Sequence, residues 1–152
     1  RIGETVALNL GDVRLSARKG TIIVRSGKGD RYREIPVHAE LRDNLVNWLD
    51  ERSDWPGADT SPALLLNQRG GRLSSRGARD IHATLAADAC LDRDFTSHVL
   101  RHTFGTTLVR DGHDLVLVAE LMGHRRLETT RGYTLPNAAD RERAIASLPT
   151  DR

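Results

Sequence analysis

The sequence has little cysteine, little lysine and no long apolar run. Cys90 is the only cysteine among 152 residues, which excludes a disulfide within the chain and a cysteine-based zinc site. We therefore expect a reducing, cytoplasmic location. No apolar stretch approaches the roughly 20 residues that a membrane-spanning helix needs, and no signal peptide is present, so we expect no membrane partner.

Lysine is scarce because arginine supplies nearly all of the 23 basic residues; only Lys19 and Lys28 are lysines. Arginine presents a planar fork of donors that matches phosphate oxygens, although a GC-rich genome would produce the same bias. The net charge of +2 permits a nucleic-acid partner without requiring one. The ordinary hydrophobic content of 38% predicts one globular domain over residues 1–152.

The first third of the chain predicts a helix end followed by a small antiparallel sheet. Residues 1–7 are typical of a helix end, and residues 14–15 of a short strand. The β-branched run at residues 21–25 and the alternation over residues 31–37 indicate two further strands. Glycines in the segment 26–30 suit a tight hairpin turn between them.

The remainder predicts helices, so the fold class is α+β, mainly helical with a three-stranded antiparallel sheet near the N-terminus. Apolar residues at helical spacing support this interpretation. Ser74 or Ser75, Thr96 or Ser97, and His113 or Asp114 are the candidate N-caps. The predicted helices cover residues 38–52, 75–90, 98–110, 114–122, 127–131 and 138–148.

His98 and Arg101 form the first candidate site. They lie three residues apart at the start of a predicted helix, so they share a face. The positive end of the helix dipole and its unpaired N–H groups suit an anion there. A surface arginine beside a capping histidine would produce the same pattern.

A zinc site is an alternative use of the same segment. His98 and His102 have the i, i+4 spacing of zinc ligands, and His124 is a possible third ligand. However, Val99 stands where a metalloprotease places its glutamate.

Three further residues have ordinary explanations when each is taken alone. Gly123 and His124 follow an apolar helix as a glycine C-cap and a histidine favoured by the helix dipole. Tyr133 fits a half-buried core tyrosine. Lys28 fits a solvated turn lysine, although a hairpin tip is also able to carry an ammonium into a DNA groove.

These residues form an ordered series: arginine, glutamate three residues later, Gly-Lys-Gly in a turn, His-x-x-Arg-His, Gly-His, and tyrosine nine residues on. This series resembles the catalytic domain of the tyrosine recombinases, the family of lambda-type integrases, Cre and the Xer proteins. The matching stretches are Arg1–Glu4, Val24–Arg33, Ser97–Phe104, Leu121–His124 and Thr129–Thr134.

The resemblance implies a role for each residue of the series. Tyr133 would attack the scissile phosphate and form a 3′-phosphotyrosyl link. No nucleotide cofactor and no metal would be needed, because the link conserves the bond energy and arginines replace the metal. The other implied roles are phosphate binding by Arg1 and Arg101, a further hydrogen bond from His124, proton acceptance by His98, leaving-group protonation by Lys28, and support of this array by Glu4.

The resemblance also implies partners. We expect a double-stranded DNA recombination site, a homo-tetramer on that DNA and a monomer in isolation. Arg76 and Arg79 are our candidates for groove contact. The helix 138–148 would dock on a neighbouring subunit or pack on its own domain, and the sequence leaves both open.

Arg1 opens the chain without an initiator methionine or a helix cap. We therefore expect a fragment of a longer protein, preceded by the DNA-clamping domain of the family. Three other functions stay open: a type IB topoisomerase, a DNA-binding module without catalysis, and a metal hydrolase that uses the three histidines. Chelation would abolish the activity of the last.

Overall fold

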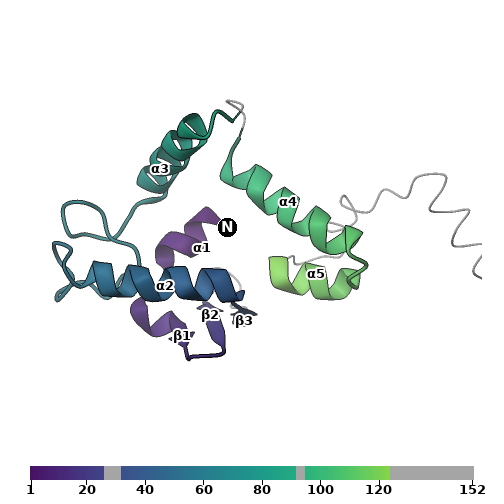
Figure 1. Cartoon of the computed structure of the whole chain (residues 1–152), viewed down its shortest axis with the longest axis horizontal. Helices are drawn as coiled ribbons and strands as arrows, with labels where there is room; N and C mark the ends of the chain where they lie inside the picture. Colours follow the sequence, from purple (N-terminus) through teal and green to yellow (C-terminus); the bar gives the residue numbers. More distant parts are fainter. Residues whose placement is uncertain (26–31, 92–94, 124–152) are drawn as a thin grey trace, which may run out of the picture. The chain divides into compact units, whose positions relative to one another are not determined.

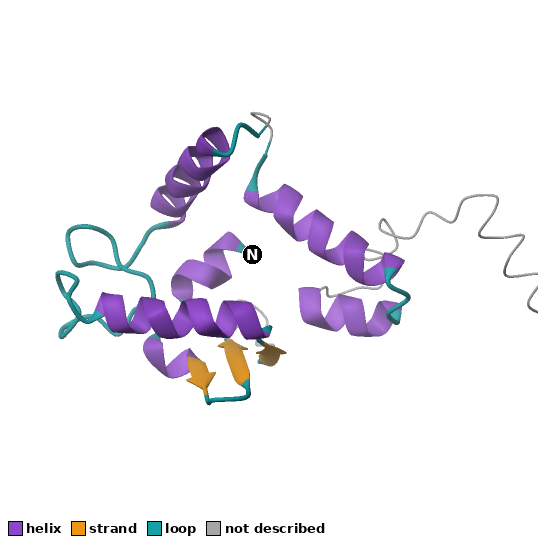
Figure 2. Ribbon diagram, in the orientation of Figure 1, coloured by secondary structure: helices purple, strands orange, loops and turns teal. Residues whose placement is uncertain are grey.

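A computed structural model of the chain describes residues 1–25, 32–91 and 95–123 (Figure 1). The chain divides into two compact units, Arg1–Arg101 and His102–Arg152, and each is described by itself. Figure 2 distinguishes the helices from the few short strands.

The first unit begins with a short helix and a small sheet. The strands form one antiparallel sheet in the order β1-β2-β3, with Val13 opposite Ile22 and Ile22 opposite Ile35. The predicted sheet near the N-terminus is therefore confirmed, whereas the turn predicted at 26–30 lies outside the described residues. The elements are α1 (Ile2–Ala7), a 3-10 helix η1 (Leu10–Asp12), β1 (Val13–Leu15), β2 (Gly20–Val24) and β3 (Arg33–Pro36).

Helix α2 (Ala39–Arg52) follows the sheet and ends in a buried arginine. The guanidinium of Arg52 donates hydrogen bonds to the carbonyls of Ser61, at 2.8 Å, and Ala63, at 2.7 Å. Trp48 donates from Nε1 to the Leu64 carbonyl at 3.0 Å. These bonds satisfy loop carbonyls that would otherwise be buried without a donor, and they hold the loop against the helix.

The core of this unit lies where α1, β2 and the segment after the loop meet. The Leu64 N–H donates to the Leu8 carbonyl at 2.9 Å. Arg72 donates to the carbonyls of Val6 at 2.8 Å and Leu8 at 2.9 Å. A helix of six residues is unstable alone, so these contacts fix the position of α1. The buried apolar residues here are Val6, Leu8, Ile23, Val24, Ala63, Leu64 and Leu66.

Helix α3 (Ser75–Asp88) contacts α1. Ser74 is its N-cap, because the Ser74 hydroxyl accepts a hydrogen bond from the Gly77 N–H at 3.0 Å. Helix α4 (Ser97–Arg110) starts in the first unit and continues into the second. Thr96 lies before it and accepts from the Val99 N–H at 3.4 Å.

Helix α5 (Leu115–Met122) belongs to the second unit. Its buried residues are Val118, Ala119 and Met122. Helices predicted at 127–131 and 138–148 lie outside the described residues. Within the described part of the chain, every helix is too short or too polar to cross a lipid bilayer.

Candidate active site

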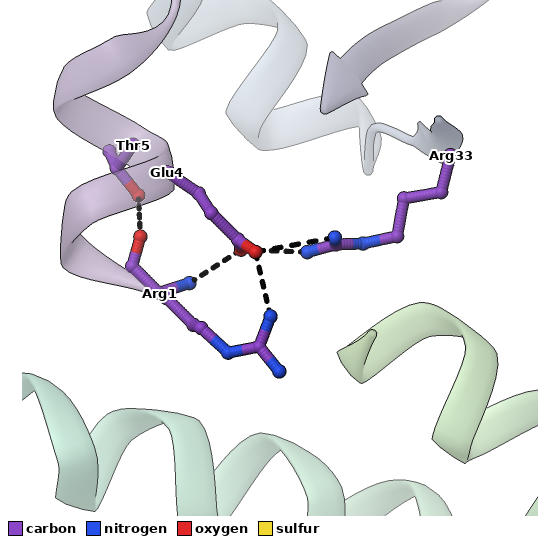
Figure 3. A network of polar contacts seen from close by, with 4 residues as sticks. All are labelled: Arg1, Glu4, Thr5 and Arg33. Carbon is purple, nitrogen blue, oxygen red and sulfur yellow. Dashed lines mark hydrogen bonds and ion pairs between the residues drawn. The ribbon is translucent and has the colours of Figure 1, made fainter. Parts of the chain in front are cut away.

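Arg1 and Glu4 form an ion pair on the first turn of α1. Their i, i+3 spacing places the two side chains on one face of the helix. Arg1 Nη1 donates to Glu4 Oε1 at 2.7 Å, and the amino group of Arg1 donates to Glu4 Oε2 at 3.2 Å. The Thr5 hydroxyl donates to the Arg1 carbonyl at 3.1 Å (Figure 3). Hydrogen bonds to both the side chain and the backbone of Arg1 therefore fix its position.

A second guanidinium, that of Arg33 on β3, binds the same carboxylate (Figure 3). Arg33 Nη2 donates to Glu4 Oε2 at 2.7 Å, and Arg33 Nη1 donates to Glu4 Oε1 at 3.4 Å. Arg33 was not among the residues predicted for the site. A signal was present, because strand alternation places Arg33 on the same face as Ile35 and Val37. A cation on an apolar strand face needs a carboxylate partner.

The Glu4 carboxyl is strongly acidic in this setting. Burial by itself would raise its pKa, but hydrogen bonds from Arg33 and Arg1 outweigh burial and lower the pKa to about 2. The exposed fractions of the side chains differ: 17% for Glu4, 11% for Arg33 and 46% for Arg1. The Arg1 side chain is therefore the most accessible of the three to a ligand.

Helix α4 carries the next two candidates. His98 is exposed and Arg101 is partly buried in its first turns. Burial is the main cause that lowers the pKa of the Arg1 amino group, and the charge of Arg101 acts in the same direction. Arg101 thus lies close enough to the first residue for its charge to act there.

Of the predicted site residues, the structure describes Arg1, Glu4, His98 and Arg101, and Arg1 and Glu4 pair directly. Lys28, His124 and Tyr133 lie outside the described residues, so the assembly of all seven into one site stays a prediction. Arg76 and Arg79 are exposed on α3.

The described residues do not test the zinc alternative, because its third ligand, His124, lies outside them. In residues 1–25, 32–91 and 95–123, no cluster of three or more histidine, cysteine, aspartate or glutamate side chains is arranged to hold a metal. His102 is exposed on α4, and His124 lies outside the described residues.

Comparison with known proteins adds to this geometry. The profile of the phage integrase family matches residues 1–140. Tyrosine recombinase XerD of Mycobacterium leprae (strain TN) is 40% identical over 140 residues, which cover 89% of this chain and 43% of that protein. Tyrosine recombinase XerC of Actinobacillus pleuropneumoniae serotype 7 is 35% identical over 134 residues, with coverage of 88% and 42%. The chain thus spans less than half the length of these curated relatives.

Solved structures agree with this comparison. XerH site-specific recombinase, in a pre-cleavage complex with its difH substrate, matches with a TM-score of 0.81 and 34% identity over 97% of this chain and 42% of that one. XerA recombinase matches with a TM-score of 0.79 and 31% identity over 99% of this chain and 54% of that one. The predicted fold class is therefore confirmed, with a helical catalytic-domain architecture and a small antiparallel sheet.

Proposed function

The chain belongs to the phage integrase family, and from that premise we propose that it is the catalytic domain of a site-specific DNA recombinase. It would break and rejoin DNA strands through a 3′-phosphotyrosyl intermediate. One observation carries the proposal: the chain matches XerH, solved on its difH substrate, over 97% of its length at 34% identity. The site described above supports it, because Glu4 pairs with the Arg1 guanidinium while the Arg1 side chain stays accessible.

The chemistry begins at Tyr133. Its phenol oxygen attacks the scissile phosphorus, a bond forms between them, and the bond from phosphorus to the 5′-oxygen breaks. A phenol has a pKa near 10, so ionising it at neutral pH costs roughly 4 kcal/mol. His98 accepts the phenol proton, and Lys28 protonates the departing 5′-oxygen.

The arginines stabilise the negative charge that develops on the non-bridging phosphate oxygens. Arg1 and Arg101 donate to the non-bridging oxygens, and His124 supplies a further hydrogen bond. Hydrogen-bond donors that are already in position before the reaction lower the activation barrier by several kcal/mol, because they do not have to reorient during it. Support for this role comes from Arg1, which Glu4 holds by a 2.7 Å ion pair while 46% of the Arg1 side chain stays exposed.

Strand exchange follows from reversal of the same step. The phosphotyrosyl bond conserves the energy of the broken phosphodiester, so a second 5′-hydroxyl is able to attack it without a nucleotide cofactor. Two duplexes require four active sites, which fits a homo-tetramer on DNA. Residues 138–148 would then dock on a neighbouring subunit, and Arg76 and Arg79 would contact a groove.

A pool of nicked duplexes with randomised arms tests the proposal, because the pool samples many candidate recombination sequences at once. Cleavage beside the nick releases a short fragment and traps the protein on DNA. We expect a detergent-resistant protein–DNA adduct that forms equally well in EDTA and is lost in Tyr133→Phe. Sequencing the trapped DNA then identifies the site.

Tyr32→Phe is the matched control. Tyr32 is the only other tyrosine, and its exposed hydroxyl donates to Glu34. That hydrogen bond is the main cause that raises the pKa of Tyr32, which disfavours ionisation of its phenol. An adduct that survives in Tyr133→Phe but disappears in Tyr32→Phe would contradict the assigned nucleophile. Failure of the wild-type chain to form any adduct would contradict the function.

A further inference from the structure

We propose that Arg33 is a positioning residue for strand cleavage: it shares the Glu4 carboxylate with Arg1, so that Glu4 fixes Arg1 without cancelling its positive charge. The inference rests on the proposed function and adds a residue to it. Arg33 lies on β3, 29 positions from Glu4 in the sequence, and so the contact depends on the fold and not on local helix spacing.

The geometry divides the carboxylate between the two arginines. Oε1 of Glu4 accepts its shorter hydrogen bond from Arg1, and Oε2 accepts its shorter hydrogen bond from Arg33, both at 2.7 Å. Figure 3 shows the Glu4 side chain between the two guanidiniums. Charge-assisted hydrogen bonds of this length are strong and directional. Arg33 therefore fixes the carboxylate that in turn fixes Arg1.

The charge balance explains why two arginines are useful here. An isolated pair of Arg1 and Glu4 would be neutral and would attract a phosphate weakly. The side chains of Arg1, Glu4 and Arg33 carry two positive charges and one negative charge, which leaves a net charge of +1 before the amino group of Arg1 is counted. The carboxylate thus restrains Arg1 while the group as a whole still favours an anion.

Burial separates the roles of the two arginines. The Arg33 side chain is 11% exposed, whereas the Arg1 side chain is 46% exposed. Within the described residues, Nε of Arg33 is buried and makes no hydrogen bond. The two terminal nitrogens that bind Glu4 therefore anchor the Arg33 guanidinium. Arg33 acts on the reaction through Glu4, and Arg1 is the group that faces a ligand.

The first test is the single-turnover rate of adduct formation on the trapped DNA identified above. We expect Arg33→Met to lower the rate roughly 10- to 100-fold, because small displacements of a charged donor have effects of that size. Arg33→Lys keeps the charge without the fork and should recover part of the rate. The affinity of these variants for DNA should change by a smaller factor than their rate of adduct formation.

Arg14→Met is the matched control. Arg14 lies on β1 of the same sheet, and its side chain is 66% exposed and 3.9 Å from Glu34. Exposed ion pairs of this kind contribute little to stability. The rate of adduct formation in Arg14→Met should therefore stay within about twofold of the wild-type rate. Thermal unfolding of each variant establishes that it is folded before rates are compared.

A pH profile and a double-mutant cycle separate positioning from general support of the fold. In Arg33→Met, burial of Glu4 is opposed mainly by Arg1, so the pKa of Glu4 should rise from about 2 toward its ordinary 4.5 or above. Protonation of Glu4 at acid pH should then slow adduct formation more in Arg33→Met than in the wild type. Glu4→Gln combined with Arg33→Met should be no slower than the slower single variant.

The outcomes distinguish the two proposals. A wild-type chain that forms no adduct contradicts the proposed function and this inference with it. A wild-type adduct together with an unaltered rate and pH profile in Arg33→Met contradicts the inference alone. Multiplicative losses in the double variant would also overturn it, because Arg33 would then act independently of Glu4. If Arg33→Met fails to fold, the same comparison uses Arg33→Lys, and an unaltered rate and profile there overturns the inference.

Discussion

Glu4 shows at the level of one residue how a partly buried charge is kept ionised. Burial opposes the carboxylate, and the hydrogen bonds from Arg33 and Arg1 more than compensate for it, which lowers the pKa to about 2. Asp12 follows the same logic: burial would raise its pKa, but hydrogen bonds from Arg25 and from the Asn9 N–H lower it. Arg25 Nε donates to Asp12 Oδ1 at 2.6 Å.

Glu4 should contribute stability that depends on pH. Its folded pKa lies below the ordinary 4.5, so the contribution is complete above about pH 4.5 and is lost as the pH falls toward 2. We expect Glu4→Gln to lower the free energy of unfolding at pH 7 by on the order of 2 kcal/mol, with allowance for partial exposure. Urea unfolding followed by circular dichroism at a series of pH values measures this.

The difference between wild type and Glu4→Gln should shrink between pH 4.5 and about 2. Asp43→Asn is the control, because Asp43 is 65% exposed and pairs only with its neighbour Arg42 among the described contacts. A constant difference across this range would contradict the assignment of the low pKa to Glu4.

The partners of single residues were predictable from the sequence where the two residues lie close together in the chain. Glu4 follows Arg1 by three positions on a helix, and that pairing is explicit in the sequence. Arg33 is distant, so only its place on the apolar face of a strand pointed to a partner. The buried Arg52 gave no such signal, because its acceptors are the carbonyls of a loop whose path depends on the tertiary fold.

Among the elements, α5 shows how two end residues define a helix. Asp114 Oδ1 accepts from the Val116 N–H at 2.8 Å and from the Leu117 N–H at 3.3 Å. Gly123 ends the helix in the left-handed conformation, with φ of 64°. Side chains other than glycine adopt that conformation at a cost, which explains the choice of residue.

Removing the cap should destabilise the second unit. We expect Asp114→Ala to lower the free energy of unfolding by about 1 kcal/mol, because two N–H groups lose their acceptor. Asp111→Ala is the control, since Asp111 is exposed beyond the C-terminal end of α4 and a negative charge there is unfavourable. Equal losses in the two variants, measured by urea unfolding, would contradict the capping role.

Helix and strand positions were largely predictable because their end signals are local. The structure assigns Ser74 and Asp114 where the sequence left two candidate caps each. The ends of strands were harder to predict: β3 covers Arg33–Pro36, where it pairs with β2, and Val37, which the alternation included, follows the strand. The order of these elements, together with the motif series, was sufficient to predict the fold class.

For the whole molecule, the proposed partner is a strongly charged polymer, and the net charge of the chain is only +2. Affinity must therefore come from local groups of arginines and not from the average charge. Composition could not predict where those groups lie. Their placement requires the fold, which puts Arg76 and Arg79 on the exposed surface of α3.

The salt dependence of DNA binding tests that placement. Each phosphate contact releases counterions, so the affinity of the chain for the trapped duplex should fall steeply with salt. Arg76→Ala and Arg79→Ala should each reduce the slope of log affinity against log salt by roughly 1. Arg18→Ala, in the exposed turn after β1, is the control and should leave the slope unchanged. Unaltered slopes in both α3 variants would contradict groove contact by α3.

Identifying the amino acid that becomes joined to DNA tests the central claim most directly. Trypsin releases the two tyrosines in separate peptides, residues 132–141 for Tyr133 and residues 32–33 for Tyr32. Mass spectrometry of the digested adduct should find the nucleotide mass on peptide 132–141, joined to the tyrosine oxygen. A nucleotide on peptide 32–33, on any histidine or serine, or on no peptide would contradict the account.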